Sequence, residues 1–131
     1  MHTRVQKAVG GYLFVQGGAI IAFWALYWIV HTFRDLVTSS DRQQSFSALA
    51  APDLMLAALS IAAAETWRRQ WRVAQPLVLL QAGASMYATV LALSLWSSDP
   101  ARWLVVVTMI PMGVCAALCG LIAWRSGARA A

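Results

Sequence analysis

The sequence predicts an all-α integral membrane protein with four antiparallel transmembrane helices in an up-down bundle. Of its 131 residues, 60% are hydrophobic and only 11% are charged, whereas a soluble domain carries about 25% charged residues. Four long apolar runs nearly exhaust the chain, and each is close to the ~20 residues that a helix needs to cross a bilayer. Helices are the expected spanning element because they satisfy their backbone hydrogen bonds internally.

The first span is predicted over about residues 9–33, behind a short basic arm. A positive start followed by an apolar core also occurs in secretory signals. This run is too long for a signal, however, and it ends in bulky Trp and Tyr where a cleavage site needs small residues. We therefore expect the span to be retained. Residues 34–49 follow as a polar outer loop.

Three further spans complete a single four-span domain over residues 1–131, and they are predicted at about 50–67, 76–97 and 101–124. Pro52 suits an early helical position, and Asp53 places a carboxylate where the helix dipole favours it. The second span is rich in small residues, which let helix backbones approach closely in a bilayer. It is therefore expected to be the most protein-enclosed helix. The short links between the last three spans predict antiparallel neighbours.

The distribution of basic residues predicts that both termini are cytoplasmic, in a multi-pass protein of the plasma (inner) membrane. Cytoplasmic segments of membrane proteins carry an excess of Lys and Arg. Seven such residues lie on the side of the termini: Arg4, Lys7, Arg68, Arg69, Arg72, Arg125 and Arg129. Three lie on the other side: Arg34, Arg42 and Arg102. Trp residues gather at both interfaces, and we expect Trp67, Trp71 and Trp124 at the inner one and Trp28, Trp96 and Trp103 at the outer one.

One candidate ligand site lies at the outer ends of the first two spans. Five residues fall on one face of a continuous helix, at i, i+3, i+4, i+7 and i+11: Trp24, Tyr27, Trp28, His31 and Asp35. Asp53, from the next antiparallel span, is expected at a depth similar to that of His31. A His–carboxylate pair beside an aromatic wall, with Tyr87 as a further wall residue, suits a cation or a polar ligand head. The alternative is an interfacial aromatic belt with a hydrated His, which needs no ligand.

A second candidate tier consists of polar and sulfur side chains inside the bilayer. Gln16 and Gln81 are expected at similar depth and can hydrogen-bond each other, with a structural role as the alternative to a functional one. Cys115 and Cys119 share a face of the fourth span because they are four residues apart. Packing is the ordinary role of such small residues, although soft sulfur ligands also suit Cu(I).

The motif content disfavours most enzyme and cofactor classes. The sequence contains no Gly-rich phosphate loop, no H-E-x-x-H motif, no Ser nucleophile elbow and no C-x-x-C pair. We therefore expect no metal site and no cofactor. The net charge of +5 comes from arginines between apolar runs, without a basic stripe that would follow a phosphate backbone. No nucleic-acid partner is expected.

The remaining choice is between two non-enzymatic functions. The sequence favours a subunit or accessory partner of a membrane complex, because small-residue faces suit contact with a membrane-protein partner or a second copy of the chain. The alternative is a small transporter or binder of a lipophilic or cationic ligand, using the outer aromatic, His31 and Asp53 pocket. A membrane enzyme acting on lipid is a third option, without a motif to support it.

Overall fold

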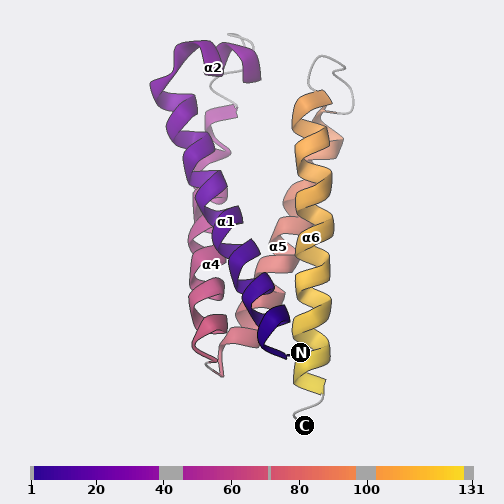
Figure 1. Cartoon of the computed structure of the whole chain (residues 1–131). Coiled ribbons are helices and arrows are strands. Elements are labelled where there is room, and N and C mark those ends of the chain that lie inside the picture. Colours follow the sequence, from indigo (N-terminus) through magenta and orange to yellow (C-terminus); the bar gives the residue numbers. More distant parts are fainter. Residues whose placement is uncertain (1, 39–45, 71, 97–102, 129–131) are drawn as a thin grey trace.

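The computed structural model describes residues 2–38, 46–70, 72–96 and 103–128. Within these residues the chain forms five helices and no strand (Figure 1). The helices are α1 (His2–Ile29), α2 (His31–Val37), α4 (Ala50–Arg68), α5 (Ala74–Trp96) and α6 (Trp103–Ala128). The all-helical prediction is thus confirmed for the described residues.

Helix α1 ends at Ile29, short of the predicted end of the first span at residue 33. Val30 has an extended backbone, with φ −106° and ψ 104°, so the chain leaves the helix there and re-enters one in α2. Figure 1 shows α2 lying across the end of the α1–α4 pair. Phe33 and Val37 hold it there because both pack into an aromatic cluster on α1. Residues 34–37 of the predicted loop 34–49 are therefore helical.

The four long helices form two pairs that separate toward the α2 end of the molecule. Helix α1 packs along α4, α5 packs along α6, and α4 joins the pairs by packing against α5. Helices α1 and α6 meet only near the end where both termini lie (Figure 1). The Tyr12 hydroxyl of α1 also donates a hydrogen bond of 2.8 Å to the backbone carbonyl of Met112 in α6. The antiparallel order expected from the short links is visible in this arrangement.

The main hydrophobic core lies at the end of the molecule that carries the termini. All four long helices contribute to it, with Val9, Leu13, Ala63, Ala64, Trp67, Ala74, Val78, Cys119 and Ala123. At the opposite end the buried cluster comes from α1, α2, α4 and Phe46 alone. The two helix pairs consequently share a core at one end and are left less tightly joined at the other.

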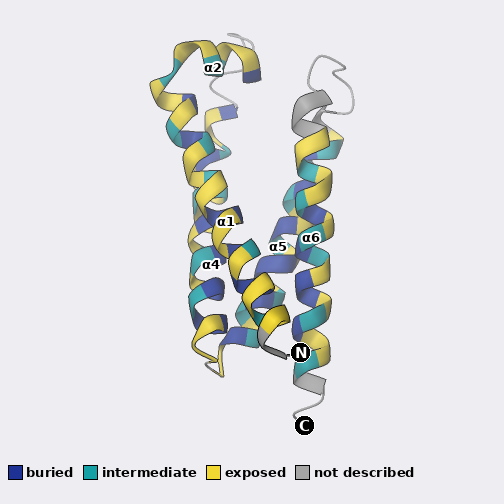
Figure 2. Cartoon of the chain, viewed as in Figure 1, coloured by how far each residue is buried: buried dark blue, intermediate teal, exposed yellow. Residues whose placement is uncertain are grey.

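Three of the helices are long and apolar enough to cross a membrane: α1 over Arg4–Ile29, α5 over Ala74–Ser94 and α6 over Val107–Ser126. Between 28% and 33% of the residues in these segments are buried inside the chain. Figure 2 shows exposed residues along their outward faces, and many of these are large and apolar, including Phe14, Leu80 and Val114. A soluble monomer does not expose apolar surface on this scale, so the fold is compatible with a membrane protein.

The tryptophans expected at the interfaces occupy different environments. Trp28 and Trp124 are exposed, as an interfacial belt requires, whereas Trp67 is buried in the main core. The ring of Trp67 packs in this core beside Ala63 and Ala64, and its predicted depth at the inner interface stays a prediction. The other side chains used for orientation lie outside the described part: Arg42, Trp71, Trp96, Arg102, Trp103 and Arg129.

A glycine sets the closest approach of α1 to α4. A Cβ atom added at Gly17 would lie 2.7 Å from Cγ1 of Ile61 and 2.9 Å from the carbonyl oxygen of Ala57. The second contact is with backbone, which cannot rotate away. Small residues on α4 complete this contact, as Ala57 and Ser60 are fully buried. The helices pack closely here because Gly17 has no side chain, which leaves room on α1 for Ile61 and for the backbone of α4.

Gly17→Ala is expected to destabilise the protein by about 1–3 kcal/mol, because the added methyl group forces α1 away from α4. The matched control is Gly18→Ala, since a Cβ at Gly18 would meet no atom within 4 Å. The control should be neutral or slightly stabilising, because Ala favours a helix more than Gly does. Reversible unfolding in mixed detergent micelles measures both variants, and equal stability of the two would contradict this account.

Candidate functional site

Asp53 is held at the start of α4 by a hydrogen bond from α1. The indole Nε1–H of Trp24 donates to Oδ2 of Asp53 at 3.1 Å, and Trp24 itself is only 1% exposed. The carboxylate is half-buried and lies in the first turn of its helix, where the helix dipole favours negative charge. The partner that the structure assigns to Asp53 is therefore Trp24.

His31 is not brought to Asp53. Within the described residues the two side chains form neither a hydrogen bond nor an ion pair, and His31 is exposed at the beginning of α2. The expectation of a neighbouring pair assumed a helix that continues through residue 31. Because Val30 is extended, the turn at the end of α1 carries His31 and Asp35 off the face that bears Trp24.

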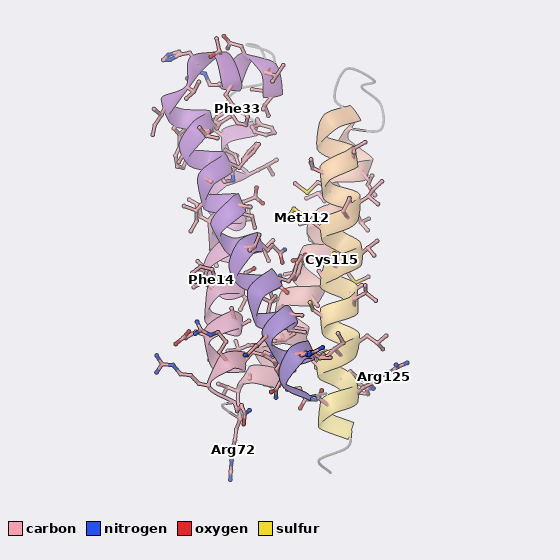
Figure 3. The ribbon with its side chains drawn as sticks, in the orientation of Figure 1. Phe14, Phe33, Arg72, Met112, Cys115 and Arg125 are labelled. Carbon is pink, nitrogen blue, oxygen red and sulfur yellow. The ribbon has the colours of Figure 1, made fainter. Side chains whose placement is uncertain are left out.

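The aromatic residues of α1 form a packed cluster rather than an open wall. Tyr27 is 1% exposed, and the rings of Trp24, Tyr27 and Phe46 have centroids 5.3 to 5.6 Å apart. Phe23 and Phe33 extend this cluster with edge-to-face contacts. Figure 3 shows Phe33 on the side of α2 that faces the bundle. Trp28, by contrast, is 53% exposed, so the predicted stripe is divided between interior and surface.

An apolar groove lies beside Asp53, between α4 and α5, with a volume of about 210 Å³. Leu49, Pro52, Asp53 and Leu56 line one wall, Ala84, Tyr87, Ala88, Leu91 and Ala92 line the other, and Met109 of α6 closes the back. Tyr87 is 71% exposed. Of the residues proposed for the outer site, the structure thus places Asp53 and Tyr87 on one groove, while the aromatic residues of α1 do not line it.

A smaller cavity of about 30 Å³ continues from this groove into the bundle. The two share Asp53, Leu56, Ala88 and Met109. Its lining is mostly apolar, but Gln16, Ser85 and Thr89 contribute polar side chains to it. Figure 3 shows Met112, which also lines it, pointing from α6 toward α1.

A buried hydrogen-bond cluster lies next to this cavity and joins three helices. Nε2 of Gln81 donates to Oε1 of Gln16 at 2.7 Å, and Ser85 Oγ and Ser60 Oγ lie 2.9 and 3.2 Å from the same nitrogen. Nε2 of Gln16 donates to Ser85 Oγ at 2.8 Å. The structure therefore brings Gln16 and Gln81 into the contact expected from their depth.

The cluster contains one unpartnered atom, because Oε1 of Gln81 is buried without a hydrogen-bond partner. An unpaired buried acceptor destabilises a fold by about 1–3 kcal/mol.

Sequence reasoning missed Ser60, Ser85 and Thr89 as members of this region. A signal for two of them was available, because Gln81, Ser85 and Thr89 follow one another at intervals of four on one helix face. The hydroxyl of Thr89 also bonds back to the carbonyl of Ser85 at 2.8 Å, a common way to satisfy a hydroxyl within an apolar helix. Ser60 does the same with Leu56.

The two cysteines are free thiols with different surroundings. Cys119 is buried in the main core, whereas Cys115 is half-buried. Figure 3 shows Cys115 on α6, one turn from Met112. Within the described residues no group of three or more His, Cys, Asp or Glu side chains is placed to hold a metal ion.

Comparison of the chain with protein-family models, with curated proteins and with solved structures finds no match. Every functional statement about the groove and the polar cluster therefore depends on the chain's own geometry.

Gln81→Leu is expected to destabilise the protein more than Gln16→Leu. Loss of Gln81 removes the hydrogen bonds of its Nε2 to Gln16, Ser60 and Ser85, and it exchanges the unpaired Oε1 of Gln81 for an unpaired Oε1 of Gln16, so the net cost is the lost hydrogen bonding, about 1–2 kcal/mol. Loss of Gln16 still leaves the two N–H groups of Gln81 with Ser60 and Ser85 as acceptors. Unfolding in mixed micelles measures both variants.

The double variant completes a thermodynamic cycle. A coupling energy of about 0.6 kcal/mol is typical of hydrogen bonds between membrane helices. Additive effects, or a greater loss for Gln16→Leu, would contradict the assigned geometry.

Proposed function

We propose that this chain is a non-enzymatic, four-span membrane protein that binds an amphiphile with an apolar body and a cationic head. The observation that carries this proposal is the groove between α4 and α5, which combines a nearly apolar lining with one carboxylate. An apolar pocket with few, well-placed polar groups is the usual form of a small-ligand site.

The chemistry of Asp53 supports a cationic head. Within the described residues its carboxylate has no basic partner, and the indole of Trp24 supplies its one side-chain hydrogen bond. A half-buried carboxylate without a counter-charge gains from a cation that enters the groove. The exposed ring of Tyr87 lines the same groove, and an aromatic face attracts ammonium groups. His31 has no part in this version of the site.

The packing of α4 supports its assignment as the fourth span, although it is not among the three helices that are apolar enough by composition. Its 19 residues extend over about 28 Å, close to the ~30 Å of the hydrocarbon core. It packs along α1 and against α5, so less of its surface would meet lipid. Lower hydropathy is acceptable in a helix enclosed in this way.

A second candidate function is that of a subunit or accessory partner in a membrane complex. Gly11 and Gly18 of α1 favour it, because a Cβ at either position would meet no atom of the chain within 4 Å. They are seven residues apart and therefore lie on one outward face. A partner helix or a second copy of the chain could approach closely there. The groove supports ligand binding with more specific chemistry than the face of Gly11 and Gly18 gives to the accessory function.

Asp53→Asn is expected to weaken binding of dodecyltrimethylammonium about tenfold, which corresponds to roughly 1.4 kcal/mol, because the counter-charge is removed. Tyr87→Leu should weaken it by a smaller factor, through loss of the ring face. Binding is measured on the protein in nanodiscs of zwitterionic lipid, by thermal shift and by isothermal titration.

Asp35→Asn provides the matched control, since Asp35 is an exposed carboxylate at the same end of the molecule, outside the groove. It should leave binding unchanged. Dodecanol, which has the same chain without the charge, should be insensitive to Asp53→Asn. Equal affinity of the wild type for the two amphiphiles would overturn the proposal and favour the accessory function.

We also propose that both termini are cytoplasmic in a plasma (inner) membrane, because the basic residues are concentrated at their end of the bundle. In a background of Cys115→Ala and Cys119→Ala, the exposed positions Thr32 and Gln70 report on the two ends. A membrane-impermeant maleimide should label Thr32→Cys in intact cells and should label Gln70→Cys after lysis alone. The reverse pattern would exclude this orientation.

A further inference from the structure

Positive charge is concentrated at the end of the molecule that carries the termini. Six exposed basic residues lie there, from α1, from the end of α4, from the turn before α5 and from α6: Arg4, Lys7, Arg68, Arg69, Arg72 and Arg125. Glu65 is the one carboxylate among the described residues of this end, so its net formal charge is +5. At the opposite end the described charges are Arg34, Asp35 and Asp53, a net −1 with neutral His31.

Most of these basic side chains have no carboxylate partner. Glu65 accepts from Nε of Arg69 at 2.6 Å and lies 3.6 Å from Nη1 of Arg68. These pairs occupy the only carboxylate available within the described part of this end. Arg4, Lys7, Arg72 and Arg125 form no ion pair there, and their charges remain available to an external anion.

The positions of these residues match the depth of lipid headgroups. The apolar segments of α1 and α5 begin at Arg4 and Ala74, and that of α6 ends at Ser126. Arg4, Arg72 and Arg125 therefore lie within two residues of the points where three apolar helices begin or end. Figure 3 shows Arg72 extending past the end of the bundle and Arg125 extending sideways from α6. Together they reach headgroups below and beside the helices.

We infer that this end of the bundle binds the phosphate groups of anionic phospholipids. Guanidinium groups bind phosphate with paired, charge-assisted hydrogen bonds, and basic residues beside membrane helices attract anionic lipid. The helices that carry these cations are exposed and apolar on their outward faces. This placement favours a lipid, whose acyl chains cover the helices, over a soluble phosphate or a nucleic acid. The inference is independent of the Asp53 groove.

The test uses the full-length protein in nanodiscs that contain equimolar phosphatidylcholine and phosphatidylglycerol. Native mass spectrometry counts the lipids that stay bound after release, and phosphatidylglycerol should be enriched. Arg72→Gln with Arg125→Gln should reduce this enrichment, by up to roughly fivefold for each charge removed at low salt. Lys at both positions should restore most of it, because the charge is retained. High salt should weaken the enrichment, since the side chains are exposed.

Arg34→Gln is the matched control, because it removes one positive charge at the opposite end of the molecule. It should leave phosphatidylglycerol enrichment unchanged, and circular dichroism and thermal unfolding should show that every variant is folded. Equal retention of the two lipids by the wild type would overturn the inference. So would displacement of bound phosphatidylglycerol by millimolar inorganic phosphate or by an oligonucleotide, which would point to a soluble anion. None of these outcomes bears on amphiphile binding at Asp53.

Discussion

The structure depends on how polar side chains are satisfied where water is absent. In a bilayer, helices gain little from hydrophobic burial against each other, so small residues and directional hydrogen bonds set their register. Gln16, Gln81 and Ser85 join α1 to α5, and Ser60 brings α4 into the same cluster. Gly17 allows α1 to approach α4 so closely that a Cβ atom at this position would lie 2.9 Å from the carbonyl oxygen of Ala57. The relative heights of three helices follow from these contacts.

The groove lies where the contacts between the two helix pairs end. Below the polar cluster all four long helices share a core, and Tyr12 connects α1 to α6. Above it, the aromatic cluster around Trp24 and Phe46 completes the α1–α4 pair without reaching α6. The space between α4 and α5 is left with apolar walls and with Asp53 at its edge. The same Trp24 that fills the aromatic cluster also holds Asp53 in place.

The two ends of the molecule differ in charge as well as in packing. The closely packed end carries Arg4, Lys7, Arg72 and Arg125 without ion-pair partners among the described residues, and the more open end carries two of the three described carboxylates, Asp35 and Asp53. Glu65 forms ion pairs with Arg68 and Arg69. The proposed cytoplasmic orientation and the proposed binding of anionic lipid both depend on this excess charge, and they are compatible because basic residues can orient a membrane protein and also attract anionic headgroups. The proposed amphiphile site lies at the other end of the molecule, away from this positive charge.

The sequence by itself determined the four long helices, because apolar runs of helical length and their polar interruptions are local properties, but it did not predict α2. It also predicted that Gln16 and Gln81 lie at a similar depth, since each is about two turns into its span and the two spans run in the same direction (Figure 1); the structure shows the hydrogen bond between them. It did not determine where the side chain of His31 lies relative to Asp53. An extended Val30 between two helices is decided by the burial of Phe33 and Val37 in the aromatic cluster, which is a tertiary contact. Tertiary structure likewise decided that the rings of Trp24, Tyr27 and Phe46 pack against one another, so they do not form an open wall for a ligand. The opening lies instead beside Tyr87, because a groove depends on which helices separate, and no single helix encodes that separation.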